Sequence, residues 1–180
     1  WEPLQGGGEG WRSATWEIGG EYEKIGTAFQ SLGNPGLPSD LEMGRLYTRL
    51  GRGGVDFEAS VGREEDNVDD SPLIPTSRTD IARLGLNCSP TISSEGRGRL
   101  LRLLLGQPSF GVSAQQAWDR TDSVPEDFTG NETDFRSRDL QLSLGSAYSL
   151  WDWYFGFSQG LQDDFTGQIS DTRSDSYDLT

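Results

Sequence analysis

The sequence contains no histidine, and it has a single cysteine, Cys88, and a single lysine, Lys24. The lack of histidine excludes a histidine-based catalytic triad, an imidazole metal ligand and a histidine general acid or base. One cysteine excludes an intrachain disulfide and a cysteine-rich metal site, and its place at the end of an apolar face favours a small hydrophobic filler. The sequence also has no run of 18 apolar residues, so it predicts no transmembrane helix.

Basic residues are scarce as well, with 15 Lys and Arg against 29 Asp and Glu in 180 residues, for a formal net charge of −14. Such an acidic chain would repel a phosphate backbone, so we expect no nucleic-acid partner. Hydrophobic residues make up only 33%, but aromatic residues reach 11%, which is untypical of a disordered chain. The length suits one domain. We place this domain at residues 11–180, after a glycine-rich segment, 1–10, that we expect to be flexible.

The dominant pattern is an alternation of apolar and polar residues with a period of two, which is typical of strands with two different faces. Val55 and Phe57, for example, alternate with Asp56 and Glu58. The pattern predicts strands at about 11–24, 41–50, 54–64, 78–88, 109–119, 134–148, 150–161 and from about 174. Most exceed the usual strand of a soluble protein and match the roughly 9–11 residues with which a tilted strand crosses a bilayer. Residues 97–105 fit a short helix as well as a strand.

The connections between the predicted strands alternate in length. Long connections are expected at 25–40, 65–77, 120–133 and 162–173, and tight turns at 51–54 and near Ser149. Long loops at one end and short turns at the other are typical of a meander that spans a membrane, whereas a soluble sandwich has no reason to sort its loops. The alternation is kept if residues 97–105 belong to an elaborated turn, or to the following strand bent at Pro108.

Five segments have a more particular pattern: Tyr22-Glu23-Lys24-Ile25, Phe29 to Pro35, Leu37 to Asp40, Gly62 to Asn67, and the hairpin from Trp151 to Arg173. Together they cover about half of the chain, and they resemble stretches of large, porin-like outer-membrane β-barrel proteins of bacteria. The resemblance implies a barrel in the outer membrane of a diderm bacterium, and it implies no reaction. The chain ends at Thr180 in mid-alternation, without the C-terminal aromatic residue of a finished barrel, so we expect a segment of a larger barrel.

Candidate sites for chemistry are weak. The acidic run Glu64 to Asp70 could bind Ca²⁺, but it lacks EF-hand spacing, and a solvated outer loop is the simpler interpretation; Asp119 to Asp127 and Asp163-Asp164 are weaker cases. No carboxylate pair stands against an apolar wall that would raise one pKa, and no serine has a histidine or Ser-x-x-Lys partner. Gly6 to Gly10 lacks the Lys-Ser/Thr of a phosphate loop. The sequence therefore predicts no catalytic, cofactor-binding or metal residue, and no enzyme.

Aromatic residues gather near the expected strand ends, and charges repeat along the polar face. In a membrane barrel the aromatic residues would form belts at the two interfaces, whereas in a soluble sandwich they would form core. Charges along one face are costly in a dry core and natural in a wet lumen. The aromatic residues are Trp11, Trp16, Trp118, Tyr148, Trp151 and Trp153, and the polar face has Glu17, Glu21, Asp56, Glu58, Arg83, Asp139 and Gln141.

These features together predict an all-β fold, an antiparallel up-and-down meander of about eight long strands that forms a transmembrane β-barrel or part of one. The expected role is a passive pore, conduit wall or envelope scaffold in the bacterial outer membrane. Membrane lipid would be one partner, and other envelope proteins or neighbouring strands would be further partners. The alternative is a soluble extracellular β-sandwich that serves as a binding or adhesion module.

Three expectations can be compared directly with a structure. The acidic loops, Glu64 to Asp70, Asp119 to Asp134 and Asp163 to Asp175, should lie at one end of the sheet. The first and last strands should be open edges, because the last strand is too short to span. Certain apolar residues should share one exposed face: Trp16, Ile18, Val55, Phe57, Leu84, Val112, Leu142, Trp153 and Phe155.

Overall fold

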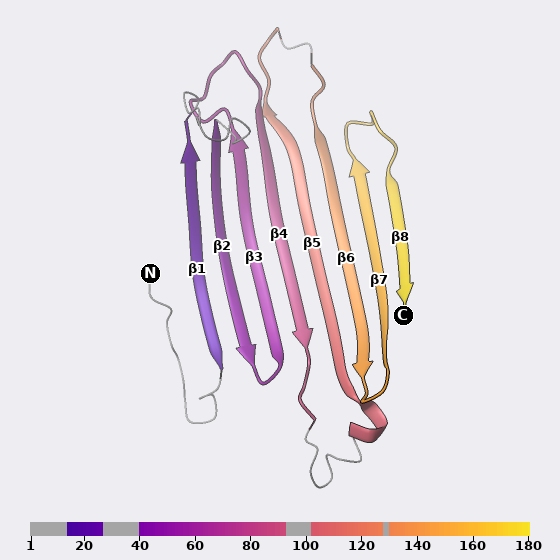
Figure 1. Ribbon diagram of the computed structural model, residues 1–180. Coiled ribbons are helices and arrows are strands. Elements are labelled where there is room, and N and C mark those ends of the chain that lie inside the picture. Colours follow the sequence, from indigo (N-terminus) through magenta and orange to yellow (C-terminus); the bar gives the residue numbers. More distant parts are fainter. Residues whose placement is uncertain (1–13, 27–39, 93–101, 128–129) are drawn as a thin grey trace, which may run out of the picture.

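Eight strands form a single antiparallel sheet in the computed structural model, which describes residues 14–26, 40–92, 102–127 and 130–180 (Figure 1). Each strand pairs with its neighbours in the chain, so the predicted all-β meander is confirmed. The strand bounds lie within four residues of those predicted. The strands are β1 (Thr15–Ile25), β2 (Leu41–Arg52), β3 (Val55–Asp66), β4 (Thr76–Cys88), β5 (Gln107–Ser123), β6 (Asp134–Ala147), β7 (Asp152–Asp164) and β8 (Thr172–Leu179).

The sheet is open. Its strand order runs from β1 to β8 without a closing pair, and Figure 1 shows these two strands at opposite sides of the sheet. The prediction of two open edges is therefore confirmed for the described strands, and they do not close into a barrel. No helix in the described ranges is long and apolar enough to cross a membrane.

The connections lie at two ends of the sheet, because every strand reverses the direction of the one before it. The ends of β1 and β2 that face each other, the β3–β4 and β7–β8 connections and the described parts of β5–β6 lie at the end drawn uppermost in Figure 1, which we call the long-loop end. The β2–β3 and β6–β7 turns and the described parts of β4–β5 lie at the opposite, short-turn end. The described residues of the acidic stretches Glu64 to Asp70, Asp119 to Asp134 and Asp163 to Asp175 fall at the long-loop end, as predicted.

The β2–β3 turn consists of Gly53 and Gly54, whose φ angles are 55° and 83°. Two successive positive φ angles are typical of a type I′ turn, whose twist matches that of the flanking strands. The β4–β5 connection is longer and contains one helical turn at residues 102–105. Residues 97–101 of the ambiguous segment lie outside the described residues. The described part belongs to an elaborated turn, so successive connections still lie at alternate ends of the sheet. The alternation in length fails at this point, because the β4–β5 connection, residues 89–106, is longer than every connection at the long-loop end.

The helical turn is fixed to the neighbouring β6–β7 turn. The Tyr148 hydroxyl donates to the carbonyl of Leu104 at 2.9 Å, and the Ser146 hydroxyl donates to the carbonyl of Leu105. The Tyr148 ring also stacks on the Trp151 ring, with 4.3 Å between their centres. Two connections at the short-turn end are thus held together.

Asn67 organises the β3–β4 loop at the opposite end. Its side chain is only 3% exposed, and its amide nitrogen donates to the carbonyl of Ser71 and to the hydroxyl of Thr76, each at 3.0 Å. Its carbonyl oxygen accepts the Ser71 N–H at 2.8 Å. The backbone of Asn67 has a φ of 53°, a conformation that asparagine tolerates better than most residues.

The sheet is a single layer without a hydrophobic core. No hydrophobic side chain is buried among the described residues, and those that are buried and polar are Ser60, Asn67, Thr76 and Ser146. The described strands form no second sheet. A β-sandwich would need such a sheet, because its core consists of two inner faces packed together.

Candidate functional site

One face of the sheet carries a continuous apolar band from β1 to β8. Pairing registers place residues on a common face, and three neighbouring rows define the band. The central row is Trp16, Leu50, Phe57, Leu86, Val112, Leu142, Phe157 and Tyr177; the row toward the short turns has Val55, Cys88, Phe110, Leu144, Phe155 and Leu179; and the row toward the long loops has Ile18, Ala59, Leu84, Ala114 and Leu140. Trp153 extends the band by one position on β7.

The band is exposed. Trp16, Ile18 and Leu84 are 49%, 50% and 48% exposed, and no member of the band is buried. All nine residues predicted to share this face lie on it, but only some are fully exposed. Exposed are Trp16, Ile18, Val55, Leu84 and Phe155, and half-buried are Phe57, Val112, Leu142 and Trp153. Around Ala59, Ala82 and Ala114, the small side chains leave an open hollow of about 720 Å³. An apolar surface of this continuity marks an interaction site, because soluble monomers rarely expose one so large.

Aromatic residues lie toward both limits of the band. Trp16 on β1 and Trp153 on β7 are near the short-turn end, and Trp153 follows the stacked Tyr148–Trp151 pair of the β6–β7 turn. Trp118 lies near the long-loop end of β5, in the same register row as Tyr22 and Arg136. Trp11 lies outside the described residues. The described positions agree with two belts, although a membrane interface at either belt stays a prediction.

Beyond the band, the same face changes to a charged belt at the long-loop end. Cross-strand pairs include Arg63 with Asp80 at 2.6 Å and Arg138 with Asp163 at 2.6 Å. The belt comprises the basic residues Lys24, Arg63, Arg78, Arg120, Arg136, Arg138 and Arg173 and the acidic residues Glu42, Glu65, Asp80, Asp122, Asp134, Asp163 and Asp175. Its charges therefore balance, in contrast to the chain as a whole.

The limit between band and belt is inclined to the rows of paired residues. On β8 the first charged or amide side chain of this face is Asp175. The row of paired residues that contains Asp175 reaches β1 at Ile18. On β1 the first such residue is Lys24, six positions further along. Between them the limit passes Arg63 on β3 and Gln116 on β5. Six residues rise about 20 Å and seven strand spacings cover about 34 Å, which gives a slope of about 30°.

This slope has a physical meaning. A planar boundary between oil and water would cut tilted strands obliquely, so the change from apolar to charged residues would shift steadily from strand to strand. Strands of transmembrane barrels are tilted by about 35–45°. The slope of the band is close to that range. A sheet that exposed its apolar face for another reason would not need such a steady shift.

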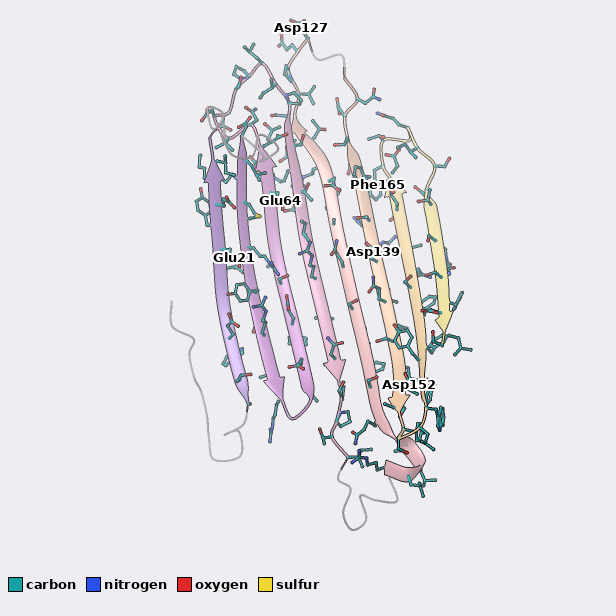
Figure 2. All side chains as sticks on the ribbon, in the orientation of Figure 1. Glu21, Glu64, Asp127, Asp139, Asp152 and Phe165 are labelled. Atoms are coloured by element: carbon teal, nitrogen blue, oxygen red, sulfur yellow. The ribbon has the colours of Figure 1, made fainter. Side chains whose placement is uncertain are left out.

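The opposite face is polar and acidic. Its strand residues include the acids Glu17, Glu21, Glu23, Asp56, Glu58, Glu64, Asp66, Asp119, Asp139, Asp152, Asp164 and Asp178, and the bases Arg45, Arg49 and Arg83. The seven residues predicted for the polar face all lie on it. Figure 2 labels Glu21, Glu64, Asp139 and Asp152, which are spread from β1 to β7.

An ion network stiffens the polar face between β1 and β3. Arg49 lies 3.8 Å from Glu17 and 3.3 Å from Glu58, so it joins carboxylates on both neighbouring strands. The Tyr47 hydroxyl donates to Glu17 at 3.1 Å, and a Cβ at Gly19 would collide with the Tyr47 ring. The glycine therefore gives the ring room to lie across β1. Exposed pairs of this kind add little energy individually, but together they fix side-chain positions.

The acidic side chains of the run Glu64 to Asp70 do not lie together, because neighbouring residues of a strand point to opposite faces of the sheet. Glu64 points to the polar face, whereas Glu65 lies on the other face with Arg78 at 2.7 Å. Asp66 accepts the Ser77 N–H at 2.6 Å. No group of three or more His, Cys, Asp or Glu side chains in the described part of the chain is placed to hold a metal. The absence of a cofactor stays a prediction.

Asp164 holds the β7–β8 loop through several donors. Its carboxylate accepts the Thr166 hydroxyl at 2.7 Å and the N–H groups of Thr166 and Ile169 at 2.9 and 2.5 Å. These hydrogen bonds, with that from the Thr166 hydroxyl first, lower the pKa of Asp164 below its ordinary value. The ionised carboxylate is therefore the form that orders this loop.

We expect the loop to lose this order in acid. Because the folded-state pKa is lowered, its stabilisation is present above the ordinary Asp value of about 3.9 and is lost as pH falls through the folded value. The amide proton shift of Ile169, followed by NMR, should titrate with a midpoint below about 3.9. Asp164→Ala should remove the transition, and a midpoint at or above the ordinary value would contradict the arrangement.

No protein-family model matches the chain, and no curated protein or solved structure matches it. The resemblance to outer-membrane barrels therefore stays a prediction, and arguments about function rest on the geometry of the two faces. The charged belt was not predicted from the sequence. The sequence nevertheless contains a pattern that could have predicted the belt. Arg63 stands two residues after Val61, and Asp80 stands two residues before Ala82, so the apolar face of each of these strands changes to charged residues at one end.

Proposed function

We propose that the chain forms part of the wall of a transmembrane β-barrel in a bacterial outer membrane, where it serves as a passive pore, a conduit wall or an envelope scaffold. The apolar band would contact lipid, and the acidic polar face would contact water. The observation that supports this most is the inclined limit of the band. It combines an uncovered apolar surface, a charged belt on one side and a slope close to the strand tilt of membrane barrels.

Backbone chemistry agrees with this role and adds a requirement. Strands β2 to β6 pair on both sides, and β7 pairs with β8 over Phe155–Gln162, so the N–H and C=O groups in these paired stretches are satisfied even in hydrocarbon. The outer edges of β1 and β8 are unpaired within the described residues, and each unpaired group in lipid costs several kcal/mol. Both edges must therefore be covered in the membrane, by neighbouring strands, by another envelope protein or, in vesicles that hold this chain alone, by further copies of it.

The alternative, a soluble β-sandwich, needs a second apolar layer over the band. The described strands form no second layer over the band. Along each strand, residues of the band or belt alternate with residues of the polar face. A wet, charged face is costly inside a sandwich and natural along a water-filled lumen. The described residues hold no metal group and the sequence has no catalytic motif, so we propose no reaction.

A fractionation experiment tests the proposed function. The full chain, expressed in a diderm bacterium and directed to the periplasm, should sediment with outer membranes, resist extraction with urea and require detergent for release. The physical reason is that the exposed apolar band gains its free energy only in contact with lipid. Recovery of the folded chain as a monomer in the detergent-free soluble fraction would contradict the proposal.

A further inference from the structure

One arginine of the charged belt has no carboxylate partner among the described residues. The guanidinium carbon of Arg136 lies 5.2 Å from the centre of the Trp118 ring and 5.3 Å from that of Phe165. The nearby acids have other partners, since Asp163 pairs with Arg138 and Asp134 accepts the indole N–H of Trp118 at 2.8 Å. The Nε of Arg136 is shielded from solvent and makes no hydrogen bond.

The surroundings fix this cation without neutralising it. Two aromatic rings from different elements, Trp118 on β5 and Phe165 after β7, hold the guanidinium by cation–π attraction. Figure 2 shows Phe165 at the long-loop end, near the end of β7. A cation–π contact uses the flat face of the guanidinium, so it does not occupy the two Nη donor groups in its plane. Those donors match the spacing of two phosphate oxygens, which is why arginine is favoured at phosphate sites.

The position relative to the apolar band indicates the source of the phosphate. Arg138 is the first charged residue beyond the band on β6, and Arg136 is the next residue on that face. A lipid whose acyl chains lay on the band would bring its headgroup to this level. A free anion would instead approach a chain with a net charge of −14 without any hydrophobic gain to offset the repulsion.

We propose that Arg136, held between Trp118 and Phe165, binds the phosphate of an anionic lipid headgroup in the leaflet at the long-loop end. The inference rests on the proposed function, because it needs the band to lie in lipid. It adds a specific contact that orients the sheet in the membrane. The ion pairs of the belt would surround this arginine, which has no carboxylate partner among the described residues.

Arg136→Gln and a matched control, Arg83→Gln, test the proposal. Arg83 lies on the polar face and donates to Gln115 at 2.9 Å, and no ion pair to it is present in the described ranges. Partitioning of the full chain is measured into vesicles of phosphatidylcholine with and without phosphatidylglycerol. The ratio of the two partition coefficients should fall about fivefold for Arg136→Gln, as expected for one basic residue at an anionic surface, and should stay unchanged for Arg83→Gln.

Other outcomes overturn the proposal in distinguishable ways. Equal ratios for the two variants would mean that Arg136 acts only through net charge. Equal competition by inorganic phosphate in solution would mean that the site takes a free anion rather than a lipid. Failure to enter either type of vesicle would contradict the proposed function itself. Should Arg136→Gln lose its β circular dichroism, Arg136→Lys keeps the charge without the fork and should give a ratio between those of the wild type and a neutral variant.

Discussion

Arginine in place of Leu84 is expected to prevent the chain from entering a membrane. Leu84 lies near the middle of the apolar band and is 48% exposed, so an arginine there meets no steric barrier. On the lipid face of a barrel, arginine near the bilayer midplane costs about 2–4 kcal/mol. Partitioning into phosphatidylcholine vesicles, measured by flotation, should therefore fall by a factor of about 30 to 900.

Ser113→Arg is the matched control for this experiment. Ser113 is exposed on the adjacent strand β5, and its register partner is Gly85, the residue next to Leu84, so it lies on the polar face. The same charge placed there should change the partitioning little, because that face would meet water. Equal effects of the two substitutions, or a Leu84→Arg variant that partitions like the wild type, would contradict a lipid-facing band.

The strands could be predicted from sequence where the two faces differ in polarity. In β3 the contrast between Val55 or Phe57 and Asp56 or Glu58 is plain, and the predicted bounds lie within two residues of those observed. At the long-loop end of β5 and β7 the contrast disappears, since charges occupy both faces. There the predicted strands ended at 119 and 161, but β5 continues to Ser123 and β7 to Asp164.

Cross-strand ion pairs explain why those strands continue. Arg78 on β4 pairs with both Glu65 on β3 and Asp122 on β5, and Arg138 on β6 pairs with Asp163 on β7 at 2.6 Å. These contacts stabilise paired strands without any apolar face. A pattern based on hydrophobicity does not detect these ion pairs, so the strands predicted from the sequence are too short at that end.

The candidate site was predicted in part for a similar reason. Which residues share the apolar face follows from parity within each strand. The slope of the band, by contrast, depends on how far each strand is displaced against the next, and local alternation does not contain that displacement. The place of Arg136 between Trp118 and Phe165 needs the registers of β5, β6 and β7 together.

The β2–β3 turn should tolerate asparagine at its first glycine and reject it at its second. Asparagine adopts positive φ angles more readily than most residues, and Asn-Gly is a favoured type I′ pair. A Cβ at Gly53 would meet no atom within 4 Å, so Gly53→Asn should change the free energy of unfolding by less than about 0.5 kcal/mol. Urea unfolding followed by tryptophan fluorescence measures this.

At Gly54 the same substitution meets a second obstacle, because a Cβ there would overlap the carbonyl oxygen of Ser89. The Ser89 N–H also donates to the Gly54 carbonyl at 2.5 Å, and this hydrogen bond holds the residue that follows β4 beside the turn. Any shift that relieves the overlap therefore strains this hydrogen bond. Overpacking of this kind costs about 1–3 kcal/mol. Gly54→Asn should therefore lower the urea midpoint clearly, whereas equal midpoints for both variants would show that Ser89 does not pack on the turn. The φ of Gly54, 83° against 55° at Gly53, adds to the difference between the variants, because the second position of a type I′ turn favours glycine.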